Sequence, residues 1–234
     1  NVEDVALGLS IVAGHDAHDP SSSRSPVPDY LSALTLRRPP RIAVLREFFE
    51  RASPEVADVT MQAVNRLARA GAAVDEAKLP PTFQAVHAAA ALITRSDTSS
   101  IHAERHAQKA DLYRPAIRAA IEVGMLVPGE LYVRALRIRS QFRREMRPLL
   151  DRYDVLLTPT TPAPAPEGMA TGDPQFQTPW SLSGLPSITV PCGLTRSGLP
   201  LGIQLVSGNF TEASLLSAAA WCEDILGRAS APEL

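Results

Sequence analysis

The sequence predicts an α/β fold in which helices flank a mixed β-sheet. Residues 41–45 and 73–76 are short apolar segments of the kind that form strands. Ser53 and Pro54 mark the start of a helix between them, since serine caps the first amides and proline fits the first turn. The apolar face of this helix runs to Gly71. A strand, a helix and a strand in this order form a βαβ-like unit, which favours a parallel pair of strands.

Amphipathic patterns predict further helices on both sides of this unit. In each pattern apolar residues recur at helical spacing, and glycine or proline stands near several of the ends. Thr211 is the expected N-cap of the last helix. The segments are residues 2–13, 83–111, 114–124, 128–150 and 211–227.

Three more strands are predicted in the stretch 153–206. The first ends at Thr158 and Pro159, because proline has no amide hydrogen to donate to a neighbouring strand. The other two each follow a Ser-Gly-Leu-Pro turn sequence. We expect all three strands in the middle of the sheet; they are residues 155–157, 187–190 and 201–206.

The same stretch carries three motifs that resemble the amidase signature enzymes. They are DVLLTPTTPAPAP at 154–166, SGLPSITVPCG at 183–193 and GLPLGIQLV at 198–206. Each motif alone is a weak signal, but three in this order form a strong one. Residues 2–20 resemble the segment after the family's catalytic core, and residues 211–216 resemble its last helix. The resemblance covers nearly the whole chain, which corresponds to the carboxy-terminal half of such an enzyme.

The resemblance implies an amide hydrolase whose reactive groups lie upstream of this chain. The family uses a serine nucleophile in a loop rich in glycine and serine, a second serine in a cis peptide, and a lysine. No such loop occurs here, and only Lys78 and Lys109 of the 23 basic residues are lysines. Arginine cannot replace the lysine because it stays protonated. We therefore expect no catalytic residue and no cofactor in residues 1–234, which would form a single but incomplete domain.

The resemblance also points to a substrate-binding segment, residues 175–183. Relatives place a loop here beside the acyl-enzyme serine, and many have asparagine where this chain has Ser181. Together with Phe176 and Trp180, this difference implies an apolar or aromatic acyl group. The alternative is that Phe176 and Trp180 pack over the edge of the sheet.

Two other functions of the same fold stay open. Relatives that use glutamine carry adjacent basic residues near position 118, whereas Arg118 precedes two alanines here, which argues against a role in a glutamine-dependent amidotransferase. The other function is that of a non-catalytic relic or binding subunit, which would keep the pocket wall without the chemistry. A self-contained Ser/His/Asp hydrolase is disfavoured, because the chain has no G-x-S-x-G turn.

Several clusters suggest metal or nucleic-acid binding, but a simpler interpretation is favoured for each. The segment 15–19 is expected to be a solvated turn whose aspartates cap backbone amides. His102 and His106 are expected on a solvated helix face. No metal site is therefore predicted. The arginines of residues 128–150 are expected to be solvated or ion-paired; they are Arg134, Arg137, Arg139, Arg143, Arg144 and Arg147.

Composition limits the partners and the location. The chain has 234 residues, of which 45% are hydrophobic, and a net charge of −2, so a sizeable core is expected and nucleic acid or an anionic membrane is not. No apolar run reaches the length of a membrane helix and no signal peptide is visible, so a cytoplasmic location is expected. Cys192 and Cys222 are expected to be free thiols. The expected partners are a small amide substrate, the missing amino-terminal half and, as a candidate, a second copy in a homodimer.

Overall fold

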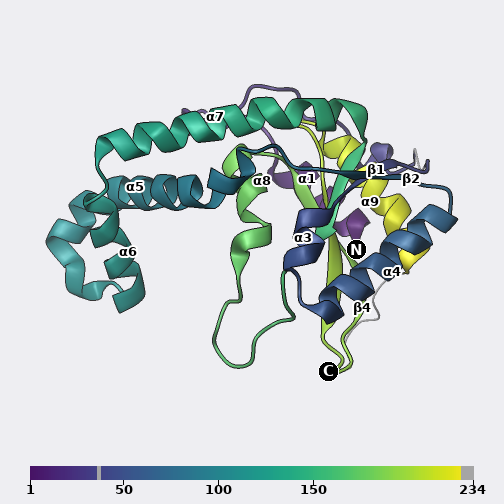
Figure 1. The fold of residues 1–234 in the computed structure, drawn as a ribbon. Helices are drawn as coiled ribbons and strands as arrows, with labels where there is room; N and C mark the ends of the chain where they lie inside the picture. The colour runs from purple at the N-terminus through teal and green to yellow at the C-terminus, as the bar shows by residue number, and fades with distance from the viewer. Residues whose placement is uncertain (36–37, 228–234) are drawn as a thin grey trace.

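The computed structural model describes residues 1–35 and 38–227, and in these residues a five-stranded sheet forms the centre of the fold (Figure 1). The strand order is β2-β1-β3-β5-β4. β1 is parallel to β2 and β3, whereas β5 is antiparallel to β3 and β4, so the sheet is mixed as predicted. The strands are β1 (Arg41–Leu45), β2 (Ala73–Ala77), β3 (Val155–Pro159), β4 (Ser187–Leu194) and β5 (Pro200–Val206).

The two faces of the sheet are buried in separate cores. Ile42 and Val44 of β1 point into one core, and Ala43 and Leu45 point into the other, because successive side chains of a strand alternate between faces. The first core is completed by α1 (Val2–Val12), α2 (Tyr30–Ala33), α4 (Pro54–Arg69) and α9 (Glu212–Leu226). The second is completed by α5 (Phe83–Lys109), α7 (Gly129–Arg152), η2 (Pro174–Phe176) and α8 (Thr178–Ser183).

The predicted βαβ unit is confirmed. β1 and β2 pair in parallel from Arg41 opposite Ala73 to Leu45 opposite Ala77, and α4 lies between them in the chain. The Ser53 side chain accepts the Val56 amide at 3.4 Å, as expected of an N-cap.

Two short helices and one strand position differ from the expectation. α3 (Arg46–Arg51) follows β1 directly, and α8 occupies a segment expected to be a loop. Both have six residues, too short for a clear helical repeat. β4 pairs with β5 alone among the strands of the described chain, so it is an edge strand and not a middle one.

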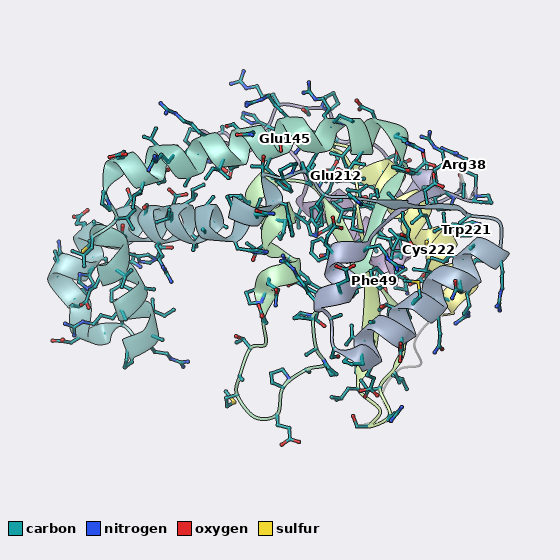
Figure 2. The ribbon with its side chains drawn as sticks, in the orientation of Figure 1. Arg38, Phe49, Glu145, Glu212, Trp221 and Cys222 are labelled. Atoms are coloured by element: carbon teal, nitrogen blue, oxygen red, sulfur yellow. The ribbon has the colours of Figure 1, made fainter. Side chains whose placement is uncertain are left out.

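α3 divides its two phenylalanines between the cores. Phe48 packs in the second core and Phe49 in the first. Figure 2 labels Phe49, Trp221 and Cys222, which all belong to the first core. α3 therefore joins both layers at the end of β1.

α5 and α7 project beyond the sheet as a helical arm, with α6 (Pro115–Met125) at its far end (Figure 1). η1 (Ala110–Leu112) connects α5 to α6. A methyl group on Gly124 would lie 2.1 Å from the carbonyl oxygen of Arg95, so this glycine lets α6 approach α5 closely. Within residues 1–35 and 38–227, no helix has both the length and the apolar character needed to cross a bilayer.

Candidate functional site

A hollow lies at the carboxy-terminal end of β3, where the chain leaves the sheet. Its volume is about 740 Å³, within the range of pockets that hold small molecules. Residues 160–166 and 170–174 form most of its wall, together with Gln177 and parts of β4 and β5. We call it the proline-rich hollow, after Pro162, Pro164, Pro166, Pro174, Pro191 and Pro200.

Backbone hydrogen bonds fix the start of this loop. The Thr160 amide donates to the Gly202 carbonyl oxygen at 3.0 Å, and the Ser53 amide donates to the Pro162 carbonyl oxygen at 2.7 Å. The first bond continues the pairing of β3 with β5, and the second joins the loop to the segment before α4. The wall is therefore held by the sheet, which is a rigid support for a site.

Side-chain amides hold the opposite wall to the sheet. The Gln177 amide group donates to the Thr160 carbonyl oxygen. Gln204 is buried in β5, and its amide group donates to the Thr158 hydroxyl and to the Phe176 carbonyl oxygen, each at 3.1 Å. A glutamine in an otherwise apolar strand is a signal that sequence reasoning could have used, because a buried amide needs partners.

Gly202 allows the three strands to meet closely at the hollow. A methyl group there would lie 2.6 Å from Thr189 Cγ2 and 3.1 Å from Thr160 Oγ1. The two threonine hydroxyls are 3.3 Å apart. Thr160, Thr189 and Gln177 thus present fixed polar groups to a mostly apolar hollow, the usual composition of a small-molecule site.

None of the three predicted substrate-binding residues is among those that line the hollow. Phe176 and Trp180 are each 1% exposed, and both pack on Phe48, with ring centroids 5.0 Å and 5.6 Å away. Ser181 is exposed at the surface of α8. The Trp180 indole nitrogen is buried and has no acceptor among the described residues. Contact of these side chains with a substrate stays a prediction.

The cysteines and lysines of the chain are not poised as nucleophiles or bases. Cys192 and Cys222 are free thiols, as expected. Burial raises the pKa of Cys192 to about 11 and that of Cys222 to about 12. Both thiols are therefore protonated at neutral pH, and the thiolate is the reactive form. Lys78 and Lys109 are exposed.

Two of the histidines on α5 do not lie on a solvated face, which corrects the expectation. His102 Nδ1 is 3.0 Å from the Tyr113 hydroxyl. The His106 ring lies against Tyr113 at 6.1 Å between centroids, and its Nε2 is 3.4 Å from a Glu122 carboxylate oxygen, an electrostatic contact and not a hydrogen bond. They pack between α5 and the segment that follows it.

The turn at residues 15–19 behaves as expected. Asp16 accepts the His18 amide at 2.9 Å, and Asp19 accepts the Ser21 amide at 2.8 Å. In the part of the chain that the structure describes, no group of three or more His, Cys, Asp or Glu side chains is arranged to hold a metal ion.

Comparison with known proteins gives a consistent result. The family model described as Amidase matches residues 1–216. A glutamyl-tRNA(Gln) amidotransferase subunit from Moorella thermoacetica is 33% identical over 252 aligned positions, which cover 94% of this chain and 51% of that protein. An amidase of Pseudomonas putida is 31% identical, over 85% of this chain and 46% of that protein. The chain thus spans about half the length of these relatives.

A solved structure shows the same fold. It is a chain of a vestigial protein complex connected with the evolutionary origins of an s-triazine catabolic enzyme. The TM-score is 0.86 at 24% identity, over 99% of this chain and 53% of that one. The family match covers most of the chain and the fold agrees with it, so this chain belongs to the amidase signature family.

Proposed function

We propose that this chain is the carboxy-terminal half of an amide hydrolase, and that the proline-rich hollow forms one wall of its substrate site. The observation that carries the proposal is the position of the hollow beside an unfilled sheet edge. Thr189 and Pro191 of β4 line the hollow, and both are exposed. An edge strand offers unpaired backbone groups to another strand. A chain that supplies further strands along β4 would therefore close the hollow.

The reaction proposed is that of a serine amidase whose reactive residues lie in the missing amino-terminal half. A serine hydroxyl attacks the carboxamide carbon, and its proton passes to a second serine and a lysine. Backbone amides of that half hold the oxyanion. The C–N bond breaks as the leaving nitrogen takes a proton, and water then hydrolyses the acyl-enzyme to the carboxylate. This chain contributes the sheet, the hollow and no reacting atom.

Phe176, Trp180 and Ser181 remain the proposed contacts for the acyl group. Ser181 is exposed, and the buried Trp180 N–H lacks an acceptor in the described part of the chain. A buried donor without a partner is costly, so an acceptor from the substrate or from the missing half would stabilise this arrangement. An apolar or aromatic acyl group suits an indole and a phenyl ring better than a glutamine side chain does.

A glutamine-dependent amidotransferase subunit is the second candidate, because several curated relatives carry that name. The arginine that could hold a substrate carboxylate is occupied in this structure. Arg118 donates to Glu122 at 2.7 Å and to Asp111 at 3.2 Å. This internal pairing favours the amidase over the amidotransferase. The third candidate is a non-catalytic binding subunit.

The test is an assay of ammonia release with the chain alone and with the polypeptide encoded upstream of Asn1. We expect no turnover by the chain alone and hydrolysis of aromatic carboxamides by the joined protein. Thr189→Val and Gln177→Ala should raise KM in the joined protein, whereas Gln175→Ala, outside the hollow, should not. Glutamine as the preferred substrate would support the amidotransferase. Turnover by the isolated chain would exclude the proposal, and no turnover by the joined protein would favour a binding subunit.

A further inference from the structure

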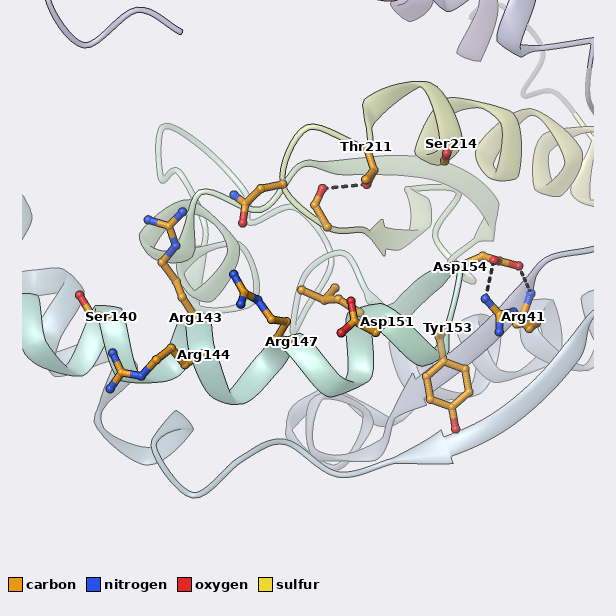
Figure 3. Close-up of a pocket in the computed structure, with 13 residues that line it drawn as sticks. Arg41, Ser140, Arg143, Arg144, Arg147, Asp151, Tyr153, Asp154, Thr211 and Ser214 are labelled. Atoms are coloured by element: carbon orange, nitrogen blue, oxygen red, sulfur yellow. Dashed lines mark hydrogen bonds and ion pairs between the residues drawn. The ribbon is translucent and has the colours of Figure 1, made fainter. Parts of the chain in front are cut away.

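A second hollow lies at the other end of β3, and arginine side chains line much of it (Figure 3). Its volume is about 630 Å³. We call it the arginine hollow; the residues on which the inference rests are Arg41, Arg143, Arg144, Arg147, Thr211 and Ser214. The length of β3, ~16 Å for a five-residue strand, separates it from the proline-rich hollow.

Three of these arginines have no carboxylate partner among the described residues. Arg41 pairs with Asp154 at 3.0 Å, whereas Arg143, Arg144 and Arg147 make no salt bridge within residues 1–35 and 38–227. The expectation of an ion-paired face is thus correct for Arg134, 3.8 Å from Glu130, but wrong for these three.

The carboxylates nearby do not neutralise the three guanidinium groups. Glu145, which interrupts them in sequence, binds Thr82 and Gln141 instead. Asp154 is held by Arg41 and Arg38. Asp151 is the remaining carboxylate that lines the hollow. One carboxylate faces three unpaired guanidinium groups, so the hollow is positively charged although the whole chain is slightly acidic.

Helix α9 begins at the same hollow with uncapped amides. Thr211 occupies the N-cap position as expected, but its hydroxyl donates to the Gly208 carbonyl oxygen at 2.7 Å and caps no amide. Thr211 and Ser214 line the hollow. Glu212, the acidic residue of this turn, lines a different depression beside Tyr30. The partial positive charge of a helix start therefore adds to that of the arginines.

Arg143 and Arg147 face this helix start together. They are four residues apart on α7, which places them on one face of the helix. Figure 3 shows both side chains extending toward the segment before α9, whereas Arg144 points away from it. A ligand between α7 and α9 would meet two planar guanidinium groups on one side and free amides on the other.

We propose that the arginine hollow binds a phosphate-bearing small molecule, with its oxyanion between Arg143, Arg147 and the first turn of α9. A single carboxylate is satisfied by one guanidinium group, whereas a phosphate or pyrophosphate has the charge and oxygens for two of them and for backbone amides. This site is independent of the proposed hydrolase, because no residue is shared with the proline-rich hollow.

The test is calorimetric titration of the purified protein with inorganic pyrophosphate at low ionic strength. We expect one site, weaker binding of inorganic phosphate, and affinity that falls as salt is added. Arg143→Gln and Arg147→Gln should each weaken pyrophosphate binding about tenfold or more, because each removes charge-assisted hydrogen bonds. Arg147→Lys should keep part of the affinity. Arg137→Gln, an exposed arginine of the same helix outside the hollow, is the matched control and should bind as the wild type does.

Unchanged thermal unfolding of the four variants would show that any loss is local. Absence of pyrophosphate binding in the wild type would overturn the proposal, and so would an equal loss in Arg137→Gln, which would indicate diffuse attraction. A short oligonucleotide that competes more strongly than pyrophosphate and loses binding in Arg143→Gln would also overturn it, because the ligand would then be nucleic acid.

Discussion

Asp154 binds Arg41 through both backbone and side chain. The Asp154 carboxylate accepts the Arg41 amide at 2.8 Å and the Arg41 guanidinium at 3.0 Å, and the Asp154 amide donates to the Arg41 carbonyl oxygen at 2.9 Å. These bonds join the first residue of β1 to the residue before β3. They fix where two parallel central strands begin, and therefore set the relative position of everything those strands carry.

Replacing Asp154 by asparagine should lower the free energy of unfolding at pH 7 by about 1–3 kcal/mol, the range for hydrogen bonds to a charged group. Burial alone would raise the pKa of Asp154, but the hydrogen bonds from Arg41 and the charges of Arg38 and Arg41 outweigh it and lower the pKa. The stabilisation is thus complete above the unfolded pKa of ~3.9 and is lost as the pH falls through the lower folded value.

Urea unfolding of wild type and Asp154→Asn at pH 7 and in acid measures this dependence. The difference between the two proteins should shrink in acid. Asp151→Asn, an exposed carboxylate with no hydrogen bond or salt bridge among the described residues, should change stability little. A difference that stays constant with pH would show that the charge of Asp154 does not matter.

Gly202→Ala should destabilise the protein by about 1–3 kcal/mol, the usual cost of overpacking. The new methyl group would press on Thr189 and on the Thr160 hydroxyl, both in the wall of the proline-rich hollow. Gly8→Ala is the control: nothing lies within 4 Å of its added methyl group, and it sits inside helix α1, so that change should stabilise slightly. Equal midpoints of denaturation for the two variants would contradict the close approach.

Phe48→Ala should cost about 3–5 kcal/mol, as large-to-small changes in a packed core do. Phe48 is 1% exposed and contacts the rings of Phe83, Phe176 and Trp180. The change should also alter the fluorescence of Trp180, which packs on it. Leu112→Ala, at a site that is 80% exposed, should be nearly neutral. A loss below about 1 kcal/mol for Phe48→Ala would mean that the second core is not packed as described.

Cys192 should react slowly with a thiol reagent such as DTNB in the folded protein and quickly in denaturant. Burial raises its folded pKa to about 11, against an unfolded value of ~8.5. Between these values the unfolded thiol loses its proton and the folded thiol does not, so stability should fall as pH rises through this window. Cys192→Ser should reduce that fall, because serine does not titrate there. Rapid labelling of Cys192 at pH 8 in the native protein would contradict the burial.

The sequence alone determined the elements that have a strong repeat or a clear boundary. Helix α4 was predicted from Ser53, Pro54 and a long apolar stripe, and its cap is present. The motifs between residues 154 and 206 identified the family because they carry information beyond local propensity. The short helices α3 and α8 were missed, since six residues do not establish a repeat.

Only the tertiary structure decided how distant residues meet. It placed β4 at the edge of the described sheet, brought Gln177 against Thr160, and buried Phe176 and Trp180 behind the hollow and not in its wall. It also set Arg143 and Arg147 opposite the start of α9. These relationships depend on strand order and helix packing, which are set by contacts between residues far apart in the chain and leave no periodic trace in the sequence.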